Sequence, residues 1–407
     1  MNLTETIRNA AAHPDQVFVI LKAGILERVP EGIQPVISIG LSIVGIMAVF
    51  PLLFALITLM ERKILGRIQN RYGPNRVGPC GLFQPIADGI KMLIKENIVP
   101  YAAIKWAHFM APVLLMFPAF LALSVIPYGR NMTPIELDAG LVFFFALGAF
   151  NEIAVFMAGW SSRNKYSLLG AMRAIAQMIS YDIPLVLSTI PVIMMAGSLS
   201  LPDIVNAQAG YHFDLLPRWF ILTPWGIAGS ILFLIAAMAE SNRCPFDIPE
   251  GESEIIAGHL TEYSGFKFAM FFMSEYIALL AASAVGVTLF LGGWHAPFPF
   301  LQWVPSYIWF FSKLISLIFL YIWIRGTLPR IRVDHLMNLA WKFLVPLSLL
   351  NLGVCVLWHY SRSWTFPGGQ GFRWLLCFAI IAIAYEVLGR KLSSSKTMHQ
   401  RVYRFVE

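Results

Sequence analysis

The chain has 407 residues, of which 57% are hydrophobic and only 13% are charged. Soluble globular proteins carry about 25% charged residues, so this composition cannot cover a water-facing surface of that size. It excludes an ordinary soluble domain and predicts a polytopic membrane protein. The formal net charge is +7. In a membrane protein, an excess of Lys and Arg indicates which loops face the cytoplasm, so we expect no nucleic-acid partner.

Apolar segments of about 20 residues, the length that an α-helix needs to cross a bilayer, recur along the chain. Nine such spans are predicted, at 36–60, 104–127, 139–160, 180–198, 222–241, 267–291, 308–326, 340–360 and 372–388. A weaker apolar stretch at 17–26 is interrupted by Lys22 and lacks the features of a cleaved signal peptide. The predicted fold class is therefore an all-α membrane bundle.

The 30 basic residues divide unequally between the two sides of these spans. The segments at 61–105, 161–180, 242–267, 325–342 and after 388 hold 22 of them, and the remaining segments hold 8. Because cytoplasmic loops carry the excess of Lys and Arg, the N-terminus is expected outside and the C-terminus in the cytoplasm. This orientation predicts a multi-pass protein of the bacterial cytoplasmic membrane.

The sequence gives no sign of a metal or nucleotide site. The four cysteines, at 80, 244, 355 and 377, are at least 22 residues apart, which is unlike the close spacings of zinc or iron–sulfur ligands. We find neither a Gly-x-Gly-x-x-Gly turn after a strand nor a Walker loop. We therefore expect no permanently bound cofactor, and any electron carrier is expected on another chain.

Residues 82–95 have the pattern of an amphipathic helix. Apolar side chains recur at helical spacing, whereas Gln84, Asp88, Lys91 and Lys95 follow one another at steps of four, three and four. Pro85 fits the first turn of such a helix. We expect it to lie on the cytoplasmic face, either as a plain interfacial anchor or as part of a site.

Five carboxylates fall inside the predicted spans or at their ends, where an ionisable group at the bilayer centre costs at least ~2.5 kcal/mol. Glu61, Asp182 and Glu240 are expected at cytoplasmic ends, where snorkelling suffices. Glu152 and Glu275 are expected about 12 Å deep, which suits either a proton path or a structural hydrogen bond to another helix. Lys313 is either a counter-ion of such a path or a snorkelling side chain.

The loop at 242–266 is unusually acidic for a cytoplasmic loop. It carries Asp247, Glu250, Glu252, Glu254 and Glu262 against the single loop base Arg243. A helix start capped by Asp247 would explain two or three of these acids. Alternatively, the loop and the basic segment after the first span form a charged vestibule suited to an amphiphile with a polar head. Two classes fit: a proton-coupled transporter, and a membrane subunit of a redox-driven pump.

Four ordered sequence blocks decide between these classes. They are ERKILGR, RYGPNRVGP and QPIAD at 61–67, 71–79 and 84–88; GWSS, NKY and SYD at 159–162, 164–166 and 180–182; PFDIPE and TEYSG at 245–250 and 261–265; and LPR at 328–330 with Asp334, Trp341 and Lys342. Together they resemble the H subunit of respiratory complex I, which is called chain one in mitochondria. The resemblance spans roughly residues 60–345.

The resemblance implies an eight-helix bundle at the junction of the peripheral and membrane arms of a proton-translocating NADH:quinone oxidoreductase. Residues 36–360 would form this core and its quinone tunnel, after an N-terminal periplasmic or interfacial segment at 1–35. Residues 361–407 would add a ninth transmembrane helix and a basic cytoplasmic tail that contacts anionic lipid or a partner. The chain alone would hold no complete active site.

The resemblance also implies particular site residues. Those matching the quinone tunnel and its loop are Arg62, Asp88, Lys91, Phe246, Glu250, Glu252 and Arg330. Those matching the buried acidic chain are Asp182, Glu240 and Glu275, and we add Glu152 because of its depth. This chain departs from the family at three positions: the family usually has Glu in place of Asp182, Ala in place of Gly251, and an apolar or small residue in place of Glu152.

Quinone is implied as a substrate, and FMN and iron–sulfur clusters are expected on partner subunits. The implied partners are the quinone-site and iron–sulfur subunits of the peripheral arm, small membrane subunits, antiporter-like subunits and membrane lipids. The nearest alternative is the equivalent subunit of a membrane-bound hydrogenase-type complex, and a stand-alone proton-coupled transporter is a third. The block at 71–79 and the acidic loop favour the quinone enzyme.

Overall fold

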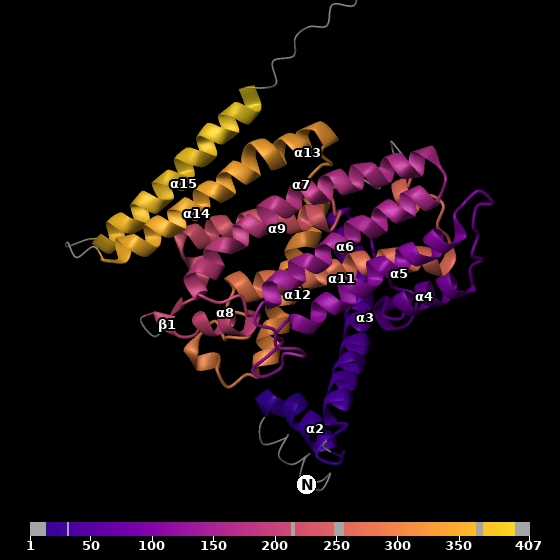
Figure 1. Cartoon of the computed structure of the whole chain (residues 1–407), viewed down its shortest axis with the longest axis horizontal. Coiled ribbons are helices and arrows are strands. Elements are labelled where there is room, and N and C mark those ends of the chain that lie inside the picture. The colour runs from indigo at the N-terminus through magenta and orange to yellow at the C-terminus, as the bar shows by residue number, and fades with distance from the viewer. Residues whose placement is uncertain (1–13, 31, 213–215, 248–255, 364–368, 395–407) are drawn as a thin grey trace, which may run out of the picture.

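Long helices dominate the computed structural model, which describes residues 14–30, 32–212, 216–247, 256–363 and 369–394 (Figure 1). Eight helical segments are long and apolar enough to cross a membrane. They are α3 (Gln34–Ile68), α5 (Lys105–Ala122) with the 3-10 turn Leu123–Val125, α6 (Gly140–Ser161), α7 (Lys165–Ala196), α11 (Gly265–Phe290), α12 (Ser306–Thr327), α13 (Val333–Leu339) continuing into α14 (Val345–Tyr360), and α15 (Gly369–Ser394). This arrangement confirms the predicted all-helical membrane fold.

The remaining predicted span corresponds to α9 (Pro224–Glu240), which has 17 residues and is the shortest of the nine. The other elements are short. They are α2 (Val17–Leu26), α4 (Gln84–Ile94), α8 (Leu201–Ala207), the antiparallel pair β1 (Tyr211–His212) and β2 (Leu216–Pro217), and 3-10 turns at Pro14–Gln16, Pro79–Gly81, Phe220–Leu222, Gly258–Leu260, Pro299–Leu301 and Ser361–Ser363.

Several helices extend beyond their predicted spans, and two of these extensions place a carboxylate well inside a helix. Helix α3 continues to Ile68, so Glu61 lies inside the helix rather than at its end and is only 5% exposed. Helix α7 begins at Lys165, so Asp182 lies near its middle. Hydropathy measures the length that crosses the bilayer, whereas a helix continues until a cap or a breaker stops it. Both groups therefore lie within helices, and their predicted place at the cytoplasmic ends of the bilayer-crossing spans stays a prediction.

The ends of α7 have clear local causes. The side chain of Asn164 accepts a hydrogen bond from the backbone N–H of Tyr166 at 3.0 Å, which caps the first turn. Gly197 follows the helix in the left-handed conformation, with φ of 72°, and stops it. Helix α7 also packs closely against α6, because a Cβ on Gly159 would lie 2.4 Å from the Cβ of Ala171.

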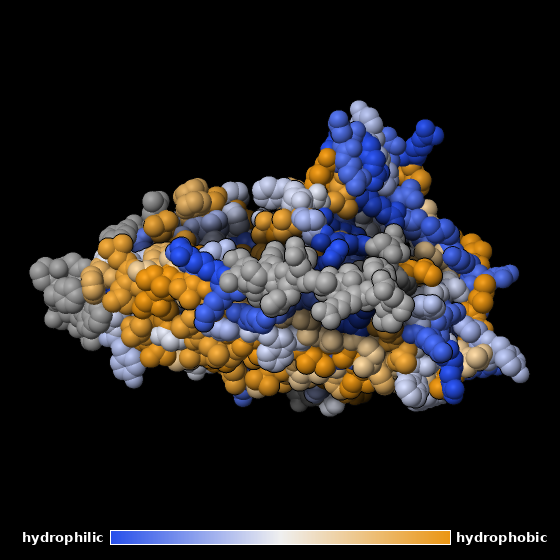
Figure 2. All heavy atoms as spheres, turned by 90° about the horizontal axis from the view of Figure 1, so that it is seen from above, coloured by the Kyte–Doolittle hydropathy of each residue, from blue (hydrophilic) through white to orange (hydrophobic). Residues whose placement is uncertain are grey.

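One helix stands at the edge of the bundle. Helix α15 lies beside α14 at the periphery (Figure 1), and only 6% of its membrane-length stretch is buried, against 61% for α11. Figure 2 shows large hydrophobic areas on the visible surface and hydrophilic side chains concentrated in one part of it. This distribution fits a chain that faces lipid or other membrane subunits over much of its surface.

The predicted amphipathic segment is a helix, α4, and it begins next to Pro85 as expected. Its apolar side chains are exposed, with Ile86 at 58%, Leu93 at 66% and Ile94 at 78%. Its polar side chains face the end of α3, as described below. This arrangement suits a helix that rests in an interface and carries a polar site on its other side.

Candidate functional site

Three of the predicted tunnel residues meet where α3 ends and α4 lies against it. Arg62 Nη1 donates to Asp88 Oδ2 at 2.6 Å, and Lys91 Nζ lies 3.4 Å from Asp88 Oδ1. Gln84 Nε2 donates to the same carboxylate at 3.3 Å. Burial raises the pKa of Asp88, but Arg62 and Lys91 outweigh it and hold that pKa below its usual range. Asp88 is therefore an anion that ties the two helices together.

Phe246 and Arg330 lie at the start of the acidic loop. Arg330 Nη2 donates to Asp247 Oδ2 at 2.7 Å, and the backbone N–H of Ile331 donates to Pro245 O at 3.1 Å. A hydrogen bond to Cys244 and the charge of Asp247 raise the pKa of Arg330. The helix-cap interpretation of Asp247 concerns residues 248–250, which lie outside the described residues. What the structure describes is an ion pair between the loop and the segment after α12.

Gln177 on α7 holds the same loop from its other side. Its Nε2 donates to Phe246 O at 2.7 Å and to Ala239 O at 2.8 Å. The Phe246 ring also packs 5.7 Å, centroid to centroid, from the buried Tyr181. Phe246 is thus held against α7 by Gln177 and Tyr181, while the acidic loop continues beyond it. The two other predicted tunnel residues, Glu250 and Glu252, lie outside the described residues.

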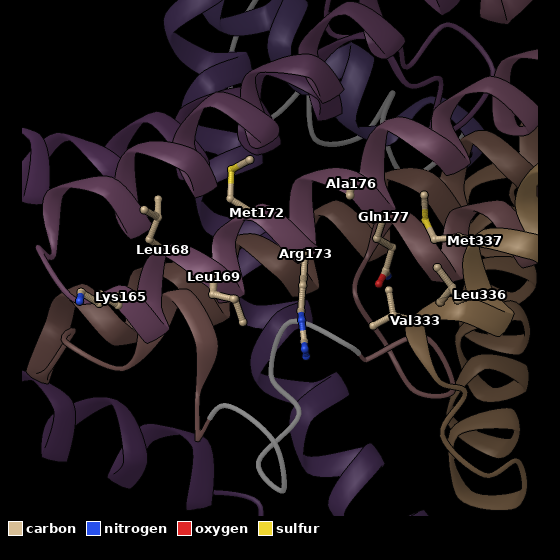
Figure 3. Close-up of a pocket in the computed structure, with 10 residues that line it drawn as sticks. All are labelled: Lys165, Leu168, Leu169, Met172, Arg173, Ala176, Gln177, Val333, Leu336 and Met337. Atoms are coloured by element: carbon tan, nitrogen blue, oxygen red, sulfur yellow. The ribbon is translucent and has the colours of Figure 1, made fainter. Parts of the chain in front are cut away.

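A pocket of about 600 Å3 lies between α7 and α13, and Gln177 is among the residues that line it. Figure 3 shows its lining, which comes from α7 and α13. Most of these side chains are apolar, and Lys165 and Arg173 are the charged ones among them. They are Lys165, Leu168, Leu169, Met172, Arg173, Ala176, Gln177, Val333, Leu336 and Met337. Gln177 therefore connects the pocket to the backbone of Phe246.

The structure also assembles a buried ion cluster that sequence reasoning missed. Glu61 accepts a hydrogen bond from Tyr276 Oη at 2.6 Å and another from Arg325. Arg243 Nη1 lies 3.9 Å from Glu61, and the Arg243 guanidinium lies 3.8 Å from the Tyr276 ring centroid. Glu275 interacts electrostatically with Arg243. One sequence feature pointed to this cluster: Glu61 is the first residue of the first sequence block, ERKILGR at 61–67.

Three of the four predicted proton-path acids come together from three helices. Asp182 on α7 is within hydrogen-bonding reach of Glu152 on α6, and it also experiences the charge of Glu240 at the end of α9. Glu240 Oε2 is buried and has no hydrogen-bond partner among the described residues. Carboxylates this close in an apolar bundle repel one another strongly when they are charged. Glu275 instead belongs to the Arg243 cluster.

Lys313 turns toward backbone groups. Its Nζ donates to the carbonyls of Leu291, Gly293 and His295 at 2.7, 2.8 and 2.7 Å, and it lies 4.1 Å from the Trp219 ring centroid. These contacts hold the turn after α11, and Lys313 forms no ion pair with a described residue; its roles as counter-ion of a proton path or as a snorkelling side chain stay predictions. Within the described ranges, no group of three or more His, Cys, Asp or Glu residues is arranged to hold a metal ion.

Comparison with known proteins identifies the family. The NADH dehydrogenase family profile matches residues 41–356. The H subunit of NADH-quinone oxidoreductase from Burkholderia vietnamiensis (strain G4 / LMG 22486) is 44% identical over 325 residues, which cover 78% of this chain and 90% of that protein. An H subunit of the same enzyme from Geobacter metallireducens is 46% identical over 309 residues, covering 74% and 90%. The Dehalococcoides mccartyi H subunit is 50% identical over 293 residues, covering 72% and 79%.

These matches span the four sequence blocks and most of the helical bundle. They confirm the resemblance that the blocks predicted, and they favour the redox complex over a stand-alone transporter. The chain therefore belongs to the family of H subunits of NADH-quinone oxidoreductase, which are membrane subunits of complex I.

Proposed function

We propose that this chain forms the quinone tunnel of its complex and couples quinone reduction to proton translocation through buried carboxyl groups. The observation that carries the proposal is the meeting of Glu152, Asp182 and Glu240, contributed by three different helices. Placing several carboxyl groups together in an apolar bundle is costly and serves no evident packing purpose. Such a group is suited to taking up and releasing protons as the charge around it changes.

The quinone end of the proposal rests on two ion pairs near the ends of the helices. The Arg62–Asp88–Lys91 group joins α3 to α4, and Arg330–Asp247 anchors the segment that carries Phe246. These groups offer charged donors and acceptors to a polar quinone head, while the exposed apolar side of α4 borders the bilayer from which a long tail would enter. The acidic loop would continue the tunnel through Glu250 and Glu252.

The Glu61 cluster links the two ends of this proposal. Arg243 contacts Glu61 and interacts with Glu275, and it follows Glu240 by only three residues. A change of charge at the quinone head would therefore shift Arg243 and alter the balance among the buried acids. This is a coupling between two sites through a polar network with more than one charge arrangement.

The wider setting follows from the family and the charge distribution. We infer an eight-helix core at 36–360 between an N-terminal segment at 1–35 and an accessory helix and tail at 361–407. The N-terminus would face the periplasm, and the charged loops would face the cytoplasm, where the peripheral arm brings electrons. Partner subunits would hold FMN and the iron–sulfur clusters, and the antiporter-like subunits would receive the coupling signal. Quinone is the proposed substrate.

The test uses native membrane vesicles that carry the whole complex. NADH oxidation with quinone and proton uptake are recorded together for wild type, Glu240→Gln and Glu275→Gln, with Glu136→Gln as the control because Glu136 is an exposed loop acid. Both buried variants should assemble and lose proton-coupled turnover, while Glu136→Gln behaves as wild type. Unchanged proton uptake in both assembled buried variants would contradict the coupling proposal.

A further inference from the structure

A second hollow, of about 770 Å3, lies at the opposite end of the helices from the proposed quinone site. Its walls come from the end of α14, the start of α15, the start of α9 and the β1–β2 hairpin, which lie near one another in Figure 1. Helix α9 runs from this hollow, at Pro224, to Glu240, and its 17 residues span about 25 Å. None of the residues assigned above to the tunnel or the proton path lines it.

The lining is basic and contains unpaired donors. Three arginines, Arg218, Arg362 and Arg373, line the hollow, and none of the described residues of its lining is acidic. Within the described part of the chain none of the three forms an ion pair, and Arg362 and Arg373 are close enough to repel each other. Arg373 Nε and Trp225 Nε1 are buried and have no hydrogen-bond partner among the described residues. Clustered cations with unused donors are suited to an anion, and phosphate oxygens match guanidinium geometry.

Tryptophans place this hollow at the level of lipid headgroups. Trp219, Trp358 and Trp374 line it beside the arginines, and Trp358 and Trp374 lie near the adjoining ends of the membrane-length helices α14 and α15. The Arg373 guanidinium lies 3.5 Å from the Trp358 ring centroid, and the Trp358 and Trp374 rings meet edge to face at 5.3 Å. Tryptophan is enriched where helices leave the hydrocarbon core, because its ring is apolar and its N–H is polar.

The hollow continues into an apolar surface. Helix α15 leaves it with exposed Leu375, Phe378 and Ile383, at 71%, 42% and 63% exposure. A free phosphate would use only the basic part of this site, and it would gain nothing from the apolar surface. A molecule with a phosphate head and acyl chains would use both parts.

We propose that this hollow binds the phosphate headgroup of an anionic phospholipid, with the acyl chains lying along α15. The arginines pair with the phosphate, and the tryptophans hold the glycerol level at the interface. The site is distinct from the lipid contact predicted for the basic tail, since that tail follows the other end of α15 and residues 395–407 lie outside the described residues. The lipid would fasten the peripheral α15 to the core.

The experiment uses the purified complex with the full-length chain and a photoactivatable phosphatidylglycerol. Crosslinks are mapped to peptides by mass spectrometry, so that other lipid sites of the complex do not interfere. Wild type should be labelled between Trp358 and Phe378. Arg362→Gln/Arg373→Gln should lower labelling about tenfold or more, since each charged hydrogen bond contributes about that factor. The control Arg390→Gln/Lys391→Gln, at the far end of α15, should keep it.

Competition identifies the ligand class. Unlabelled phosphatidylglycerol should displace the probe, whereas phosphatidylcholine with the same acyl chains and inorganic phosphate should not. Arg362→Lys/Arg373→Lys keeps both charges and should retain most of the labelling, which separates loss of charge from misfolding. Three results would contradict the proposal: phosphatidylcholine competes as well as phosphatidylglycerol, inorganic phosphate alone displaces the lipid, or labelling of the Gln variants equals that of the wild type.

Discussion

Tyr276 on α11 donates a hydrogen bond from its hydroxyl group to Glu61 Oε2 on α3 at 2.6 Å, although 215 residues separate the two in the sequence. Both residues are at most 5% exposed. The same Glu61 carboxylate also pairs with Arg243 and Arg325. A buried charge is tolerated when several partners satisfy it, and here three groups do so.

Tyr276→Phe tests this contact because it removes a single oxygen. The loss leaves one acceptor position of a buried carboxylate unsatisfied, which costs about 1–3 kcal/mol. We expect a lower unfolding temperature of the purified complex and slower quinone reduction. Tyr385→Phe removes the hydroxyl of a 62% exposed tyrosine and should change neither quantity. Equal behaviour of the two variants would show that the Glu61 contact is dispensable.

Arg62→Ala is expected to weaken quinone binding. The substitution leaves Asp88 with Lys91 and Gln84 only, so both the charge at the proposed tunnel and the seating of α4 change. The apparent KM for a long-tailed quinone should rise, with a smaller effect on kcat. Arg390→Ala removes an exposed arginine paired with Glu386 on α15 and serves as the control. Unaltered kinetics with long-tailed quinone would remove Arg62 from the tunnel.

His259 should make the packing of the acidic loop pH-dependent. Burial lowers the pKa of His259 to about 4, below its usual 6.5, so the folded loop binds the proton less well than the unfolded loop does. The stabilisation is fully present above pH 6.5 and declines as the pH falls toward 4, by an amount on the order of 3 kcal/mol.

Limited proteolysis of the complex at pH 7, 6, 5 and 4 measures this decline. Ser167 Oγ donates to His259 O, and the loop backbone packs on Gly170 of α7, so both contacts hold this part of the loop. Protonation of the buried His259 at low pH should loosen these contacts, so cleavage near Gly258 should increase as the pH falls. His259→Leu removes the titrating group and should flatten the profile. A profile that is the same for both proteins would assign the pH response to other groups.

Asp182 allows a test of charge against length. Asp182→Asn keeps a hydrogen-bonding group beside Glu152 but cannot release a proton, so proton uptake should fall strongly. Asp182→Glu restores the residue usual in the family and should keep turnover within about twofold, because the carboxyl group is retained. Asp203→Asn, on α8, is the control. Normal proton uptake with Asp182→Asn would exclude Asp182 from the path.

Deletion of residues 366–407 should leave the turnover of the assembled complex nearly intact. Helix α15 contributes little to the buried core, and the proposed tunnel and acid residues lie on other elements. Quinone-dependent NADH oxidation measures the outcome, and lipid crosslinking near Trp358 should be lost in the same preparation. Complete loss of activity in an assembled complex would give α15 more than an accessory role.

The sequence by itself determined the membrane class, the helices, the amphipathic α4 and the family. Apolar length and periodicity are local properties of the chain, and the four motif blocks are written in consecutive residues. Hydropathy did not find where α3 ends and where α7 begins, because caps such as Asn164 set these limits independently of the bilayer length.

Only the tertiary structure decided which charges meet. The Tyr276–Glu61 and Arg330–Asp247 contacts join residues 215 and 83 positions apart, and the Glu152–Asp182 contact joins two helices. Helical periodicity fixes the face on which a side chain lies, but it does not fix the rotation and depth at which one helix packs against another. Those quantities depend on the whole bundle, so the residue types were predictable and their partners were not.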